Sequence, residues 1–120
     1  MNYSFDITGN VLKVALDGRL VAACTEEFQN QVLAHRQNAD NILLDLSKMS
    51  HIDSSGLGSL VFLLQKAQSW NGTVKLACIQ PRPRIIFEIT KVYRVFDSYD
   101  TVEAAMESFL PEQREKPNQN

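Results

Sequence analysis

The sequence has few cysteines, no excess of basic residues and no long apolar segment. Its two cysteines, Cys24 and Cys78, are far apart and lack the spacing of metal ligands, which favours reduced structural thiols over a metal site. The formal net charge of −2 argues against general nucleic-acid binding, which needs a basic face for the phosphates. The longest apolar run, residues 60–64, is far shorter than the roughly 20 residues of a membrane-spanning helix. We therefore expect neither nucleic acid nor membrane among its partners.

The ends of the chain differ from its middle. Residues 1–6 have neither the positive segment nor the apolar stretch of a secretory signal, which predicts a cytoplasmic protein. Across the 120 residues, apolar side chains make up 44% and charged ones 22%, as in an ordinary folded domain. Residues 111–120 carry no apolar anchor, so we expect a domain over 1–110 and a disordered polar tail over 111–120.

The pattern of apolar residues predicts an α/β domain. Alternation on both sides of Gly9-Asn10 is typical of a β-hairpin. Beyond it we expect a helix over 25–37 with Thr25 as N-cap, a buried strand over 41–46, a helix from Ser54 or Ser55 to about Trp70, a strand over 73–79, a helix after Pro81, a short strand over 93–96 and a helix over 101–109. This order predicts a mixed, mostly parallel sheet of four to five strands with an N-terminal antiparallel hairpin and about four helices.

Helical spacing also predicts which side chains of three helices are buried. The expected buried sets are Leu57, Leu60, Val61 and Leu64; Ile85, Ile86 and Ile89; and Ala104, Ala105 and Phe109. Phe62 and Leu63 fall outside the first set. They are expected to face water or another protein surface, with complete burial under neighbouring helices as the alternative.

Two kinds of enzyme site are disfavoured at the strand-to-helix turn that begins near residue 51. His51, Asp53 and Ser54 or Ser55 have the chemistry of a nucleophilic triad, but groups so close in sequence cannot converge as a relay. The turn also lacks the lysine of a P-loop and the third glycine of a dinucleotide fingerprint. The other histidine, His35, is expected on a helix surface.

The same turn could instead accept a covalent phosphate. A phosphoserine at residue 54 or 55 would lie at the positive end of a helix dipole, near free N–H donors. Gly56 and Gly58, which cost helix stability, would let another protein approach the hydroxyl closely. The alternative reading of the same residues is structural: Ser54 or Ser55 would be only an N-cap, and the glycines would only pack against the sheet.

The segment from 42 to 109 resembles a known family. The strand ILLDLS, the turn IDSSGLG, the Asn-Gly helix end and the closing VFDSYDTVEAA come in the order seen in bacterial anti-sigma factor antagonists, the anti-anti-sigma proteins of the STAS domain family. The Asp-Ser-Ser-Gly-Leu-Gly turn between a strand and a helix is the specific part of the match. The resemblance covers nearly the whole chain apart from the tail.

The resemblance implies a phosphorylation switch without catalysis by the chain itself, and without metal or cofactor. Ser54, or secondarily Ser55, would be phosphorylated by a partner that is both an anti-sigma factor and a serine kinase of the histidine-kinase-like ATPase type. The unmodified protein would bind that partner and release a sigma factor for transcription, and a PP2C-type phosphatase would reverse the modification. The implied partner-binding residues are Asp53, Ser55, Gly56, Leu57, Gly58, Phe62, Arg19 and Val21.

One loop departs from the family pattern. Where family members often have Gly-x-Leu-Asp, this chain has Gly18-Arg19-Leu20-Val21, without the carboxylate, and the loop is expected near Ser54. Two other functions remain open from the sequence. One is a STAS scaffold or small-ligand-binding subunit of a sensory complex with a non-sigma output, and the other is an enzyme dependent on Ser54.

Overall fold

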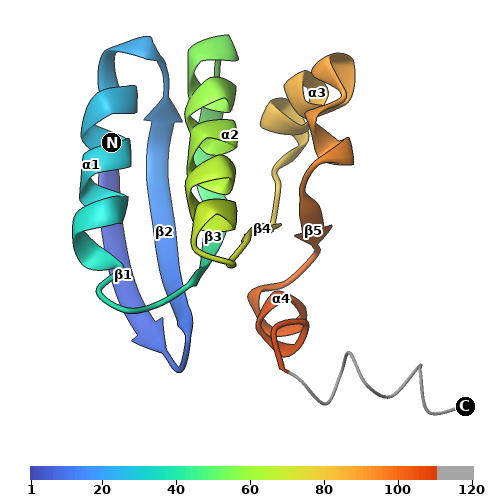
Figure 1. The fold of residues 1–120 in the computed structure, drawn as a ribbon. Helices are drawn as coiled ribbons and strands as arrows, with labels where there is room; N and C mark the ends of the chain where they lie inside the picture. Colours follow the sequence, from blue (N-terminus) through green and yellow to red (C-terminus); the bar gives the residue numbers. More distant parts are fainter. Residues whose placement is uncertain (111–120) are drawn as a thin grey trace, which may run out of the picture.

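The computed structural model describes residues 1–110 as a five-stranded sheet flanked by helices (Figure 1). The prediction for the tail, 111–120, lies outside the described residues. The elements are β1 (Asn2–Thr8), β2 (Val11–Leu20), the 3-10 turn η1 (Ala22–Cys24), α1 (Thr25–His35), β3 (Asn41–Ile52), α2 (Ser54–Ser69), β4 (Val74–Ala77), α3 (Pro81–Thr90), the 3-10 turn η2 (Val92–Arg94), β5 (Asp97–Tyr99) and α4 (Val102–Glu107). No helix within 1–110 is long and apolar enough to cross a membrane.

The sheet is mixed, as the sequence predicts. Its strand order is β1-β2-β3-β4-β5, with β1 antiparallel to β2 and the other three neighbouring pairs parallel. The hairpin turns at Gly9, whose φ of 59° suits glycine. β3 runs to Ile52, longer than the predicted 41–46, and its pairing with β2 shifts register between Ala15 and Asp17 and between Gly18 and Arg19. Such irregularities bend a strand end, here beside the start of α2.

Apolar side chains on the two faces of the sheet form two cores. Alternating residues such as Leu44 and Leu76 face α1 and α2, where they join Phe28 and Leu60 in the main core. On the opposite face, Val11, Leu43 and Ala77 form a smaller cluster with Ala105 of α4. Figure 1 shows α1 and α2 side by side over one face, with α3 at one end of the sheet and α4 near the other. The face of the sheet covered by α1 and α2 therefore carries the larger core, and the opposite face carries the smaller one.

The ends of α2 and α4 are fixed by specific contacts. At the end of α2, Asn71 has a left-handed φ of 69°, and the Gly72 N–H donates to the Ala67 carbonyl at 2.7 Å, which confirms the predicted Asn-Gly helix end. At the end of α4, the buried Lys75 of β4 donates from Nζ to Ser108 Oγ at 2.8 Å. A cation at this position also stabilises the negative end of the helix dipole.

Several predicted boundaries and buried faces are wrong. Cys24 and not Thr25 precedes α1 as its N-cap, and α1 ends at His35 rather than 37. The strand expected over 93–96 lies at Asp97–Tyr99, because Lys91 adopts a left-handed conformation and the chain makes a 3-10 turn before it extends. Ala104 is exposed while Ala105 is buried, so α4 is rotated from the predicted face.

The α3 helix departs furthest from prediction. Ile85 and Ile89 were expected inside, yet they are 55% and 71% exposed, and Ile86 is only half-buried. The helix is anchored instead by Pro83 and by Phe87, which is 1% exposed. Phe87 is therefore the main buried side chain where the prediction placed three isoleucines, and Ile86 packs against the main core while only half-buried.

Candidate phosphorylation and partner-binding site

Asp53 fixes the start of α2. It is the N-cap residue, with extended backbone, and its Oδ1 accepts a hydrogen bond from the Gly56 N–H at 2.8 Å. Its Oδ2 accepts from the Ala22 N–H at 3.1 Å, and its own N–H donates to the Leu20 carbonyl at 3.3 Å. One side chain thus joins the helix start to the loop after β2, and the loop is confirmed to lie beside this turn.

The charge of Asp53 is stabilised in place. The hydrogen bond from the Gly56 N–H holds the pKa of the Asp53 carboxyl below its ordinary value, with help from the Ala22 N–H and against the opposing effect of partial burial. The positive charge of nearby His51 acts in the same direction when that ring is protonated. Asp53 is therefore ionised at neutral pH, directly before Ser54.

Ser54 and Ser55 are exposed at the first two positions of α2. Because Asp53 is the N-cap, the alternative in which either serine is only a cap is wrong. Among the residues that the structure describes, no hydrogen bond engages either hydroxyl. The buried Ser59 differs from them, since its Oγ donates to the Gly56 carbonyl at 2.6 Å within the helix.

The structure requires glycine at only one of the two glycine positions of the turn. A Cβ on Gly56 would lie 2.3 Å from the Leu20 carbonyl oxygen and 2.7 Å from Ile52 Cγ1, so glycine is required there by packing inside the chain. A Cβ on Gly58 would meet nothing within 4 Å. The expectation that close approach by a partner explains both glycines is wrong for Gly56. For Gly58 it stays a prediction.

A shallow groove of about 370 Å³ begins at Ser54 and follows α2. The α2 side is formed by Leu57, Gly58, Val61, Phe62 and Gln65, and Thr90 and Val92 form the opposite side. Phe62 is 37% exposed, as expected, but Leu63 is completely buried, so the prediction that it faces outward is wrong. Leu63 belongs to the main core, which lies under more of α2 than its apolar spacing indicates.

The loop after β2 brings two further predicted residues to the turn. Arg19 is exposed and is the register partner of His51, so two basic side chains lie on neighbouring strands beside Asp53. Val21 is half-buried. Its backbone N–H donates a hydrogen bond to Cys24 Sγ at 3.4 Å. The eight predicted partner-binding residues therefore come from two segments that meet at Asp53.

Sequence reasoning missed the far side of the groove. Thr90 and Val92 come from the end of α3 and from η2, and no local pattern reveals that this segment lies opposite Ser54. The α2 side could have been found, because residues 54, 58, 61, 62 and 65 recur at helical spacing. Within 1–110, no group of three or more His, Cys, Asp or Glu side chains is placed to hold a metal ion.

Comparison with known proteins gives the family. The STAS domain family matches residues 2–105. The chain belongs to this family. Its fold, with a mixed five-stranded sheet, an N-terminal antiparallel hairpin and four α-helices, confirms the predicted STAS architecture.

The relatives of this STAS domain include proteins named as anti-sigma factor antagonists. One from Thermotoga neapolitana is 35% identical over 68 residues, which are 57% of this chain and 60% of that protein's length. A crystal structure of such a protein from Thermotoga maritima has a TM-score of 0.82 at 25% identity, over 88% of this chain and 92% of that one. The anti-sigma factor antagonist SpoIIAA in its unphosphorylated form shares the fold, with a TM-score of 0.75 at 20% identity, over 89% of this chain and 95% of that one.

Proposed function

We propose that this STAS domain is an anti-sigma factor antagonist, a binding module that Ser54 phosphorylation switches off. The observation that carries the proposal is an exposed serine at the start of a helix, at the end of an apolar groove. Further support comes from the relatives named as anti-sigma factor antagonists, of which SpoIIAA has been solved in an unphosphorylated and, from Bacillus, in a phosphorylated form. In its unmodified state the protein would bind an anti-sigma factor and so release a sigma factor.

The proposed modification is an ordinary phosphoryl transfer. Ser54 Oγ attacks the γ-phosphorus of ATP bound to the partner kinase, the bond to the β-phosphate oxygen breaks, and ADP leaves while the hydroxyl proton passes to a base of the kinase. A phosphatase of the PP2C type would then use water to release inorganic phosphate and restore the hydroxyl. The chain itself contributes the acceptor and its surroundings, and no catalytic group.

The surroundings of Ser54 explain how the phosphate would act. The backbone N–H groups of Ser54 and Ser55 lie at the positive end of the α2 dipole, so a phosphate there leaves the helix folded. The added charge of about −1.5 to −2 would stand beside the ionised Asp53 and at the head of an apolar groove. A partner that fills the groove would have to desolvate this charge, which opposes binding without any change of fold.

The decisive test uses the histidine-kinase-like anti-sigma factor encoded nearest to this gene. With ATP, mass spectrometry should find one phosphoryl group on wild type and on Ser55→Ala, and none on Ser54→Ala. Calorimetry should find that Ser54→Ala binds the kinase like wild type, while Ser54→Asp binds at least about tenfold more weakly, a loss of about 1.4 kcal/mol. Equal binding by Ser54→Asp and wild type would overturn the proposed switch.

A second function draws on a separate groove. Residues 47–50 near the end of β3 and 80–83 at the start of α3 line a shallow, open groove of about 500 Å³, larger than the groove at Ser54. It favours the alternative of a small-ligand-binding STAS subunit of a sensory complex. A stable high-mass homo-assembly in sedimentation, together with thermal stabilisation of the protein by a small molecule that a bulky change at the exposed Ser47 (Ser47→Trp) abolishes, would support this alternative.

A further inference from the structure

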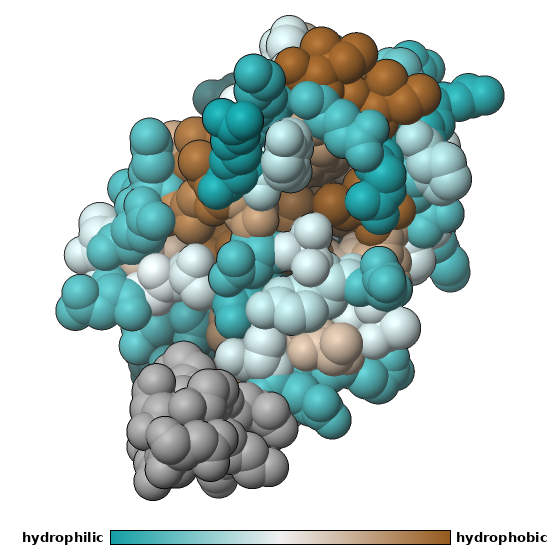
Figure 2. All heavy atoms as spheres, turned by 90° about the vertical axis from the view of Figure 1, so that its right-hand side faces the viewer, coloured by the Kyte–Doolittle hydropathy of each residue, from teal (hydrophilic) through white to brown (hydrophobic). Residues whose placement is uncertain are grey.

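An exposed apolar surface lies on α3 and η2. Ile85, Ile89, Tyr93 and Val95 are 55%, 71%, 47% and 56% exposed, and they are four of the seven large apolar side chains exposed within 1–110. Figure 2, which looks at this side of the molecule, has apolar side chains gathered at its upper end among hydrophilic ones. Single exposed apolar residues are normal, but a group of this kind marks an interaction surface.

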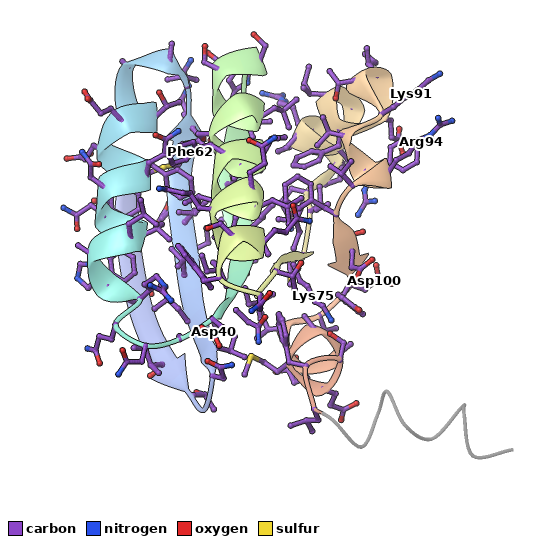
Figure 3. All side chains as sticks on the ribbon, in the orientation of Figure 1. Asp40, Phe62, Lys75, Lys91, Arg94 and Asp100 are labelled. Carbon is purple, nitrogen blue, oxygen red and sulfur yellow. The ribbon has the colours of Figure 1, made fainter. Side chains whose placement is uncertain are left out.

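Basic residues occur in the same segment as these apolar ones. Arg82, Arg84, Lys91 and Arg94 belong to the same segment, 81–95, whose only acidic residue is Glu88, so the segment has a net charge of +3 in a chain of net charge −2. None of the four forms an ion pair with residues 1–110. Lys91 and Arg94 extend outward from the molecule in Figure 3. We call the four apolar and four basic residues the α3 surface.

The α3 surface and the far side of the groove at Ser54 come from the same segment of the chain. Thr90 and Val92, which form the far side of that groove, stand between Ile89 and Tyr93 in the chain. The groove alone is lined by eight residues, whereas a stable protein–protein interface uses roughly 20–30 residues on each side. A partner that docks at Ser54 therefore needs additional surface, and the segment that forms the far side of the groove also carries the exposed, apolar α3 surface.

Charge and shape indicate what binds there. A surface with four cations among apolar side chains is complementary to an acidic and apolar one. An anionic bilayer offers that chemistry, but its flat interface cannot fill the neighbouring groove. A protein can fill the groove and cover the α3 surface in one contact, so the observations favour a protein.

We propose that the α3 surface is the second half of the docking site and binds an acidic, apolar face of the same partner that reaches Ser54. This inference rests on the proposed function. The two halves have different tasks: Ser54 makes binding depend on phosphorylation, and the basic residues of α3 and η2 accelerate association and select an acidic partner.

The test measures binding of the same anti-sigma factor by four surface variants. Arg82→Glu/Arg94→Glu reverses two charges of the α3 surface, and Lys13→Glu makes the same kind of change on the sheet. Ile89→Gln removes an apolar contact, and Ile7→Gln, on the opposite edge of the sheet, is its control. Circular dichroism and urea denaturation check that each variant is folded.

We expect Arg82→Glu/Arg94→Glu to lower the association rate and the affinity by about tenfold or more at about 50 mM NaCl, and by much less at about 500 mM. Ile89→Gln should lower the affinity by about fivefold or more at either salt concentration. Lys13→Glu and Ile7→Gln should bind like wild type.

Three results would overturn the inference. If the α3 variants bind like wild type while Ser54→Asp does not bind, the α3 surface is not part of the docking site and the proposed function stands. If wild type does not bind the anti-sigma factor, both the proposed function and this inference are wrong. In a separate arm, wild type is sedimented with phosphatidylcholine vesicles containing about 30% phosphatidylglycerol. Binding that Arg82→Glu/Arg94→Glu abolishes would assign the surface to a membrane and also overturn the inference.

Discussion

The helices α2 and α3 each follow a parallel strand of the sheet, yet they are held in opposite ways. α2 begins with an aspartate cap and buries seven residues, whereas α3 begins with prolines, has no side-chain cap and buries only Pro83 and Phe87. The well-anchored helix carries the candidate phosphorylation site, and the weakly anchored one carries the exposed apolar and basic residues. The difference shows that a firmly packed helix can hold the serine to be modified while the neighbouring helix keeps its side chains free for a partner.

The largest expected effect comes from Phe87, the largest buried side chain of α3. Phe87→Ala should lower the free energy of unfolding by about 3–5 kcal/mol, because a large buried side chain is lost and a cavity remains. Ile89→Ala, one turn or less away on the exposed side, should change it by no more than about 0.5 kcal/mol. Urea denaturation of both variants measures the difference. Comparable losses in the two would mean that the exposed face of α3 contributes as much stability as its buried face.

The next largest effect is a difference in stability between substitutions at the two glycines of α2. Gly56→Ala should destabilise the protein by about 1–3 kcal/mol, because the new methyl group collides with the Leu20 carbonyl. Gly58→Ala should stabilise it by about 0.5–1 kcal/mol, since alanine fits the helix there and meets no neighbour. Urea denaturation should therefore move the two midpoints in opposite directions. A shift of the same sign in both would show that the turn does not pack as described.

The smallest effect concerns the cap of α2, which α3 lacks. Asp53→Ala should cost about 1 kcal/mol at neutral pH. A carboxyl whose pKa is lowered by folding contributes stability above its ordinary pKa of 3.8, and this is lost as the pH falls through the folded value. The stability gap between wild type and Asp53→Ala should therefore shrink from about pH 5 to about pH 2, as measured by urea denaturation. Asp53→Asn is the control, because its side chain keeps a hydrogen-bond acceptor but does not titrate. A stability difference between wild type and Asp53→Ala that stays constant with pH would contradict the role of the Asp53 charge.

The features that sequence predicted correctly are local ones. The hairpin at Gly9-Asn10, the helix start after Asp53 and the helix end at Asn71-Gly72 depend on residues within a few positions of each other. The parallel sheet followed from the alternation of strands and helices. Such features are encoded by turn chemistry and periodicity, so one sequence is enough to find them.

The features that it missed depend on distant contacts. Apolar spacing on α3 predicted three buried isoleucines, but burial there is decided by how little of the helix reaches the sheet, which the spacing does not encode. Leu63 was placed outside because the position of α1 beside α2 was unknown, and Gly56 was misread because Leu20 is distant in the chain. In the same way, the side of the groove formed by Thr90 and Val92 could not be foreseen.

The strand order across the sheet has a consequence for synthesis. Because β1 to β5 stand side by side in the order in which they leave the ribosome, each strand finds its neighbour already present, and no strand waits for a later one. Ser54 emerges well before the segment 81–95 that completes the groove. A nascent chain would therefore carry the serine of the switch before it carries the second surface that we propose for the partner, and a partner that needs both surfaces would engage only nearly finished molecules.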